Sequence, residues 1–457
     1  MIRNFLEICE RSYNGPIVNK ADWDMKSVVK TTQRLVKKYN LAWDKNDLTP
    51  VDNDLMERTF NAAKELIVEI GVYNMSTERI IRLTTAEIEA GLSNMKQELV
   101  MGEGKDAVTL AARRPEDTRR PLIWAGNPGC PTPEHLFLPT VKSWLQEHVV
   151  DLITCGSLAT VDGYPVRSGE PSEIMAVKKE LNLLKQARLE TGRPGIGMLA
   201  AESSVSEIGD LCVAHPDYLR PCDSHLVALF NELIIDRGNL VRAANSLEYG
   251  MRNASLACTM VGGLAGDAPG ATMVIMASMM AANLLCLADY HLCHPIHISA
   301  VATGARGCLW LQSVTCQSFA QNAPAIIVCD VYPKSGGLTR ELLYEAAASA
   351  LVITVSGGHI EGCGSADGNK PNGTGLEVRL MGEVSRAATK MGLSRKDANK
   401  MVQALLAKYE HVLTAPGGNP GRAFDECYDL MTIKPKAEWE AMYDDVVNEM
   451  KGLGLAI

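Results

Sequence analysis

Hydrophobic residues in the first quarter of the chain recur at the spacing of an amphipathic α-helix. One apolar face is formed by Met56, Phe60, Ala63, Ile67 and Ile70. Gly71 provides a stop for this helix. Thr84 and Glu87 have the spacing of a capping box and predict a second helix, which we expect to end at residues 102–104. The pattern predicts an N-terminal helical region over residues 1–116, packed on the rest of the chain.

From about residue 120 the pattern changes to short apolar runs separated by helical stretches, as in repeated βα units. The candidate strands are residues 122–124, 152–154, 196–199, 226–229, 256–261, 296–300, 325–329 and 351–355. The fourth is also compatible with a helix. This alternation predicts an α/β fold, a (β/α)8 TIM barrel over residues 117–457 that ends in C-terminal helices. An open, doubly wound sheet is the alternative.

The longest apolar run covers residues 271–288 and is interrupted by Thr272, Ser278 and Asn283. A membrane span needs about 20 mostly apolar residues, so a buried core helix is the better interpretation. The N-terminal sequence lacks the apolar segment of a signal peptide. We therefore expect a cytoplasmic protein that does not bind membranes.

Composition narrows the classes of function. The 457 residues are 46% hydrophobic, which supports a large core. The net charge is -9 and no cluster of Lys and Arg appears, which argues against a nucleic-acid partner. The 13 Cys form no C-x-x-C pair and lie mostly among apolar residues, so we expect free thiols rather than a disulfide framework.

Polar residues follow several predicted strands, where barrel enzymes place their catalytic groups. Glu202 follows the third strand, Asp330 and Tyr332 follow the seventh, and His359 follows the eighth. With the strands so placed, these side chains face one mouth of the barrel. Two carboxylates, a phenol and an imidazole can perform acid–base chemistry or hold a cation. The alternative is that some of them only bond to loop backbone at the rim.

A repeated histidine pattern raises the question of a metal. His291, His294 and His297 recur at every third residue. Pro295 interrupts any helix there, and a strand would turn His297 away from its neighbours. The three imidazoles are therefore not expected to converge on zinc, and no metal site is predicted.

A glycine-rich turn covers residues 262–266, directly after a predicted strand. Gly262 and Gly263 could cradle a phosphate or admit a flat ligand. A Gly-Gly pair also simply ends strands, and the turn is neither a P-loop nor a full dinucleotide fingerprint.

Asp223, Ser224 and His225 resemble the start of the D-x-H-x-x-G motif with which corrinoid proteins supply a lower ligand to cobalt. Ala228 stands where that motif has Gly, and the segment lies between predicted barrel strands. We therefore do not expect this chain to carry the corrinoid itself. A structural role is favoured, in which Asp223 orients His225 or caps a helix.

Short stretches spread along the chain carry a resemblance to one family. They are residues 102–108, 192–197, 223–225, 231–233, 262–266, 374–377, 381–384 and 426–429. In these stretches, and over nearly its whole length, the chain is similar to the monomethylamine:corrinoid methyltransferases. The resemblance implies a (β/α)8 barrel that forms a homo-oligomer and holds no tightly bound cofactor. It also implies methyl transfer to Co(I) of a corrinoid carried by a separate partner protein.

The resemblance fails at part of the family's site. Leu199 stands where the family carries pyrrolysine, the imine-bearing residue thought to capture the amine. The family's acidic pair falls on Pro269 and Gly270, and a Gln near its pocket falls on Asp330. The resemblance therefore implies a scaffold without the amine-capturing apparatus.

Two site features do match the family, Glu202 and Tyr332. Without an imine, methyl transfer requires a donor whose leaving group is already good, such as a quaternary ammonium or a sulfonium. Carboxylates at Glu202 and Asp330, with the ring of Tyr332, suit a cationic donor. Leu199, His359 and the Gly-Gly turn are expected to line the substrate pocket.

Other hypotheses stay open. The barrel could catalyse a different small-molecule reaction, with acid–base groups or a metal. The chain could instead be a non-catalytic paralogue that keeps only assembly or binding of the corrinoid protein. Transfer from monomethylamine by another route is the least favoured.

Overall fold

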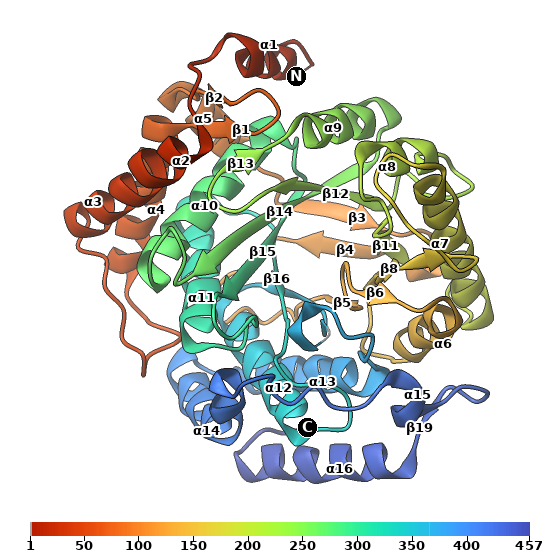
Figure 1. Cartoon of the computed structure of the whole chain (residues 1–457). Helices are drawn as coiled ribbons and strands as arrows, with labels where there is room; N and C mark the ends of the chain where they lie inside the picture. Colours follow the sequence, from red (N-terminus) through yellow and green to blue (C-terminus); the bar gives the residue numbers. More distant parts are fainter. Residues whose placement is uncertain (1, 365) are drawn as a thin grey trace.

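Eight parallel strands close into a barrel in which each strand pairs with the next in the chain and the last pairs with the first (Figure 1). The structure is a computed structural model that describes residues 2–364 and 366–457. The barrel strands are β5 (Ile123–Ala125), β7 (Leu152–Thr154), β11 (Gly197–Leu199), β12 (Ser224–Leu229), β14 (Arg252–Val261), β15 (Tyr290–His297), β16 (Ile327–Asp330) and β17 (His359–Glu361). The predicted (β/α)8 TIM barrel is confirmed, and the open sheet is excluded.

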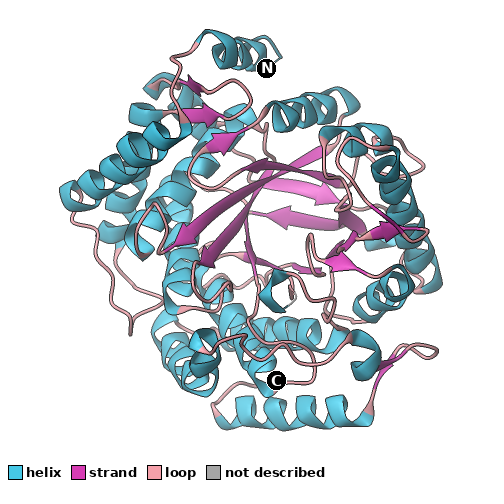
Figure 2. Cartoon of the chain, viewed as in Figure 1, coloured by secondary structure: helices cyan, strands magenta, loops and turns pink. Residues whose placement is uncertain are grey.

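One helix follows each barrel strand, and together the helices surround the strands (Figure 2). They are α6 (Glu134–Leu145), α7 (Pro171–Glu190), α8 (Glu207–Val213), α9 (Arg237–Tyr249), α10 (Ala268–Leu285), α11 (Arg306–Asn322), α12 (Arg340–Ser356) and α13 (Gly375–Met391). α10 is long and apolar enough to cross a membrane, but 94% of it is buried inside the protein. This confirms the interpretation as a core helix.

The N-terminal helices pack on one side of the barrel. They are α1 (Ile2–Asn14), α2 (Lys20–Asp22), the π-helix η1 (Trp23–Val29), α3 (Lys30–Lys38), α4 (Asn53–Ile70) and α5 (Thr85–Ser93). The predicted apolar face of α4 is buried, and Gly71, at φ 74°, ends this helix. The capping box of Thr84 and Glu87 starts α5 as predicted. α4 lies against α10 and α11, so its apolar face covers the barrel helices.

The N-terminal region was predicted to be helical throughout, but it also contains strands. β1 (Val72–Asn74) pairs with β2 (Arg79–Ile81) and β13 (Ile234–Ile235). α5 ends at Ser93 rather than at residues 102–104, and a hairpin follows, formed by β3 (Glu98–Met101) and β4 (Val108–Ala111). Its turn contains the 3-10 helix η2 (Gly104–Asp106).

The β3–β4 hairpin closes the N-terminal end of the barrel, and Figure 1 shows it within the ring of strands. Buried Leu99, Met101 and Leu110 form one apolar cluster with inward residues of the barrel strands, among them Trp124 and Leu152. The hairpin therefore acts as a plug and leaves the opposite end as the mouth.

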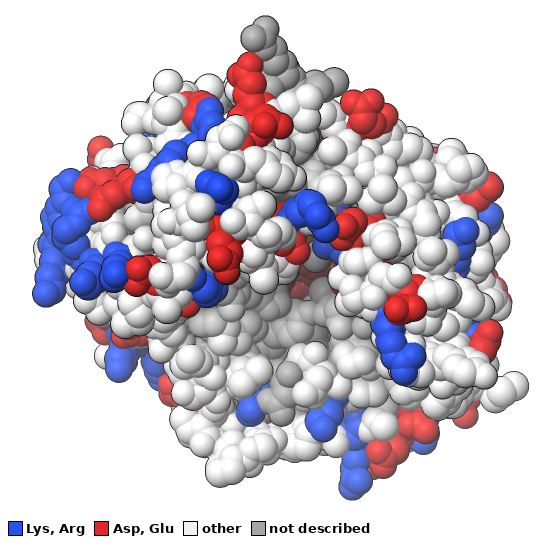
Figure 3. Space-filling model, turned by 45° about the horizontal axis from the view of Figure 1, so that its top comes forward, with Lys and Arg blue, Asp and Glu red and all other residues white. Residues whose placement is uncertain are grey.

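Further elements flank the barrel. They are β6 (Pro131–Thr132), β8 (Ser157–Leu158), β9 (Thr160–Val161), β10 (Tyr164–Pro165), the 3-10 helix η3 (Ala366–Gly368), α14 (Arg395–Thr414), α15 (Phe424–Cys427), β18 (Tyr428–Asp429), β19 (Lys434–Pro435) and α16 (Ala437–Gly452). Figure 3 shows acidic and basic side chains intermingled over the visible face, which is hollowed near its centre. All 13 Cys are free.

Two predicted strands are wrong. The sixth, placed at residues 296–300, is actually β15 (Tyr290–His297), where a His at every third position interrupts the apolar run. The eighth, at residues 351–355, belongs to helix α12, in which every residue from Leu342 to Ser356 is buried. A helix buried on all sides has the same continuous apolar run as a central strand, so periodicity could not separate them.

Candidate active site

Alternate residues of the barrel strands point inward and form layers. The lower layers are apolar or aromatic and include Trp124, Leu152, Leu199 and Tyr290, each at most 1% exposed. Nearer the carboxyl ends of the strands the inward residues become polar, beginning with Thr154, which pairs in register with Leu199. The change marks the floor of a site at the barrel mouth.

Two carboxyl groups lie side by side in the polar layer. Asp330 ends β16, Glu361 ends β17, and the register pairs these residues. Asp330 is 2% exposed and Glu361 0%. Thr154 Oγ1 donates to Glu361 Oε1 at 2.6 Å, while Asp330 Oδ1 and Glu361 Oε2 accept no hydrogen bond from a described residue. Burial raises the pKa of Asp330 to about 7. Burial, and then the charge of Asp330, raise the pKa of Glu361 well above its usual range.

His294 borders this pair from β15. Its Nδ1 contacts Asp330 Oδ2, and its ring meets the ring of Tyr332 edge-on, with centroids 4.7 Å apart. Burial lowers the pKa of His294 to about 4, against the opposing effect of Glu361. Burial therefore favours the neutral form of this imidazole.

Glu202 reaches the mouth from the loop after β11. Its backbone N–H donates to buried Glu180 Oε1 at 2.9 Å, and its carboxyl accepts from the backbone N–H of Gly129. Burial and the carboxylates of Glu180 and Glu361 raise the pKa of Glu202 well above its usual range. Because the charge of Glu361 contributes to this rise, we refer to Glu202, Asp330 and Glu361 together as the acidic cluster.

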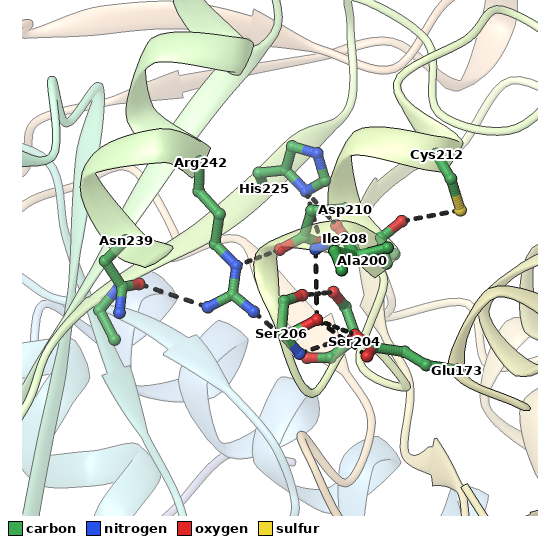
Figure 4. A network of polar contacts seen from close by, with 12 residues as sticks. Glu173, Ala200, Ser204, Ser206, Ile208, Asp210, Cys212, His225, Asn239 and Arg242 are labelled. Atoms are coloured by element: carbon green, nitrogen blue, oxygen red, sulfur yellow. Dashed lines mark hydrogen bonds and ion pairs between the residues drawn. The ribbon is translucent and has the colours of Figure 1, made fainter. Parts of the chain in front are cut away.

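A buried polar network fixes the loop that carries Glu202 (Figure 4). His225 Nδ1 donates to the carbonyl oxygen of Ala200 at 3.1 Å and lies 3.3 Å from Asp210 Oδ1. Arg242 forms an ion pair with the second oxygen of Asp210. The network thereby joins the start of the loop to α8 and α9.

The predicted role of Asp223 in orienting His225 is wrong, because Asp210 takes that place. Asp223 instead accepts from the guanidinium of Arg220, with Nε at 2.9 Å, and from the backbone N–H of Met198 at 3.0 Å. It therefore ties the start of β12 to β11. The structural role favoured for this segment lies in that connection.

Tyr332 lies at the rim of the mouth. Its hydroxyl donates to the carbonyl oxygen of Pro128, and its ring covers Gly364, where any side chain would collide with it. Burial raises the pKa of the phenol well above its usual range. With the hydroxyl already bonded, Tyr332 offers a ligand its aromatic ring.

Gly262 and Gly263 form a tight turn directly after β14. Gly262, at φ 88°, donates its N–H to the carbonyl of Gly266 at 2.8 Å, and Gly263 donates to Met260 at 2.9 Å. Since both amides are used within the turn, they are not available to a phosphate. The turn ends the strand at the rim of the barrel.

His359 was predicted to face the mouth of the barrel, but it does not. It begins β17, so it lies at the plugged end of the barrel. There Nδ1 accepts from the backbone N–H of Leu122 at 3.0 Å, and Nε2 donates to the carbonyl of Ala111 at 2.9 Å. Burial lowers its pKa to about 3. The error follows from the eighth strand, which was placed one element too early.

The three histidines of β15 do not converge. His291 points outward, where its Nδ1 lies 2.8 Å from Ser255 Oγ. His294 points inward, and His297 Nδ1 accepts from the backbone N–H of Ala300 at 3.2 Å. Across residues 2–364 and 366–457, no group of three or more His, Cys, Asp or Glu could hold a metal ion.

Sequence reasoning missed Glu361, Thr154 and the inward position of His294. Thr154 closes a predicted strand, so its place at the mouth could have been inferred. The place of Glu361 at the mouth could not be inferred, because the eighth strand was predicted within the preceding helix.

Comparison with known proteins gives one consistent match. The sequence model of the family described as "Monomethylamine methyltransferase MtmB" matches residues 4–455. The chain is 34% identical to monomethylamine methyltransferase MtmB of Methanosarcina mazei over 449 residues, 98% of this chain and 97% of the relative. For MtmB1 of Methanosarcina acetivorans the identity is 33%, with the same coverage. The crystal structure of Methanosarcina barkeri MtmB has a TM-score of 0.96 and 31% identity, and the match covers 99% of this chain and 98% of that one.

Proposed function

Since the chain belongs to the monomethylamine methyltransferase family, and is thus a methyltransferase, we propose that it transfers a methyl group from a small cationic donor to Co(I) of a separate corrinoid protein. The favoured donor is a quaternary ammonium or another activated methylamine. The transfer proceeds without pyrrolysine, because Leu199 stands at the position that matches that residue.

The acidic cluster carries this proposal. Asp330 and Glu361 lie side by side and Glu202 reaches the same mouth, and within residues 2–364 and 366–457 none of the three forms an ion pair with a Lys or Arg. Buried carboxylates without a counter-ion are costly, and a bound cation removes that cost. The ring of Tyr332 adds cation–π attraction.

The cluster serves mainly to bind and orient the donor. During transfer the positive charge on nitrogen disappears as a neutral amine leaves, so the carboxyls stabilise the bound donor more than the transition state. Catalysis then depends on holding the methyl group in line with cobalt, since Co(I) is itself a strong nucleophile. Leu199 lies below the polar layer and offers apolar surface to alkyl groups.

The partners follow from the same proposal. The corrinoid is carried by the partner protein, and this chain holds no tightly bound cofactor. The corrinoid protein approaches the open mouth, since the hairpin fills the other end. We also propose a homo-oligomer in the cytoplasm.

A methyl-transfer screen tests the proposal. The purified protein is mixed with a reduced Co(I) corrinoid protein and a panel of methylated amines, quaternary amines, sulfonium compounds and methoxylated aromatics. Formation of methyl-Co(III) is followed by absorbance. We expect methylation from a cationic donor; activity with neutral methoxylated aromatics alone would contradict the cationic pocket.

Matched variants sharpen the test. Asp330→Asn and Glu202→Gln should each lower kcat/KM for the donor by at least about tenfold, because each removes a charge that pairs with it. Glu57→Gln removes an exposed carboxyl on α4 and serves as the control. Unchanged turnover in both site variants would refute the cationic pocket.

A further inference from the structure

The two paired carboxyls at the barrel mouth each keep one oxygen without a donor. Asp330 Oδ2 is engaged by His294 and Glu361 Oε1 by Thr154, so Asp330 Oδ1 and Glu361 Oε2 are left over. The two residues are register partners on adjacent strands, and a hydrogen bond between their carboxyls needs a proton on one of them. We propose that Asp330 and Glu361 share one proton in the empty enzyme and release it to water when a small organic cation binds. This inference rests on the proposed function.

Two adjacent buried carboxylates cannot both be ionised without a counter-ion, so one retains its proton and the pair carries a single negative charge. A cation at the mouth supplies the missing charge. The O–H bond then breaks, its electron pair stays on the carboxylate, and the proton passes to solvent. The cation forms only non-covalent contacts, so the exchange is one proton for one cation.

No group around the pair offers an alternative positive charge. The titratable side chains that face it come from β14, β15, the loop after β16 and the loop after β11; they are Cys258, Tyr290, His294, Tyr332 and Glu202. Burial lowers the pKa of the histidine and raises those of the thiol, the phenols and Glu202, so it favours the uncharged form of each of these groups. The cation must therefore come from the ligand.

The exchange makes cation affinity depend on pH. Below the pKa of the pair, each bound cation has to displace a proton, so the dissociation constant should fall by about tenfold per pH unit as the pH rises. Above that pKa the proton is already lost and the affinity should level off. The sign is opposite to that expected if protonation of His294 were needed for binding.

Isothermal titration calorimetry of the full chain with tetramethylammonium tests the proposal. Titrations at about pH 6 in two buffers of different ionisation enthalpy give the number of protons released. We expect about one proton per bound cation. Binding without proton release would overturn the shared proton and leave the cationic pocket intact. Absence of binding at every pH would overturn both this inference and the proposed function.

Two variants assign the proton. In Glu361→Gln no proton can be shared, and the amide donates to Asp330 and stabilises its carboxylate, so cation binding should persist while proton release at about pH 6 falls below that of the wild type. Glu202→Gln removes a carboxyl of the same cluster but leaves the pair intact, and should still release a proton. Loss of release in Glu202→Gln but not in Glu361→Gln would refute the assignment. Near-ultraviolet circular dichroism checks that both variants fold, and Asp330→Asn, which should also lower release, replaces Glu361→Gln if that variant does not.

Discussion

Replacing Asp330 with asparagine should make the empty enzyme more stable at alkaline pH while it weakens donor binding. The side chain is buried, and burial raises its pKa from the ordinary 3.8 to about 7. Asparagine has nearly the same shape. Its oxygen can accept from His294, and its amide can donate to the free oxygen of Glu361, so few contacts are lost.

The size and sign of the effect follow from proton linkage. Between pH 3.8 and about 7 the folded protein holds a proton on Asp330 that the unfolded chain has lost, so rising pH destabilises the fold. At about 1.4 kcal/mol per pKa unit, the rise from 3.8 to about 7 corresponds to about 4 kcal/mol, so Asp330→Asn should gain up to about 4 kcal/mol above pH 7 and almost nothing near pH 4.

Urea unfolding of the wild type and of Asp330→Asn, followed at about pH 4.5 and 8, measures this difference. Asp444→Asn, an exposed carboxyl on α16, is the control and should show no such trend. A stability difference that is the same at both pH values would refute the reasoning, because the burial of an ionised Asp330 would then carry no cost.

Three further variants test the parts that support the site. Met101→Ala opens a cavity in the plug and should lower the free energy of unfolding in urea by about 2–5 kcal/mol. Lys105→Ala, in the exposed turn of the hairpin, is the control and should leave the stability unchanged. Equal effects of the two variants would contradict the role of the hairpin as a plug. Arg242→Met leaves Asp210 buried without its cation and should cost about 3–5 kcal/mol by the same assay; a neutral result would contradict the network. His359→Gln should lose about 1–3 kcal/mol yet leave KM for the donor unchanged, and a raised KM would return this residue to the mouth.

The fold could be predicted where the local pattern was unambiguous. α4 has one apolar face with a glycine stop, and β7 and β16 are short apolar runs, so their positions followed from the sequence. α12 is buried on every face, and β15 mixes histidine with apolar residues on both faces. In these two elements tertiary burial, which no local window contains, decides which residues are apolar.

The residues at the barrel mouth could be predicted wherever the carboxyl end of the strand before them was predicted correctly. Asp330, Tyr332 and Glu202 were placed at the mouth correctly because the strands before them were predicted correctly. Glu361 lay beyond reach, because its position at the mouth depends on a three-residue strand after a long buried helix. The same error brought His359 to the wrong end of the barrel.

The hairpin plug also has a kinetic consequence. Because β3 and β4 close one end of the barrel, a ligand must enter and leave through the mouth at the other end. On the proposed function, the methyl donor and the cobalt of the partner protein would therefore have to use the same opening. If the partner covers this opening, the donor has to bind first. The demethylated product can then dissociate only after the partner has dissociated. We expect compulsory-order kinetics, with excess corrinoid protein inhibiting turnover at low donor concentration.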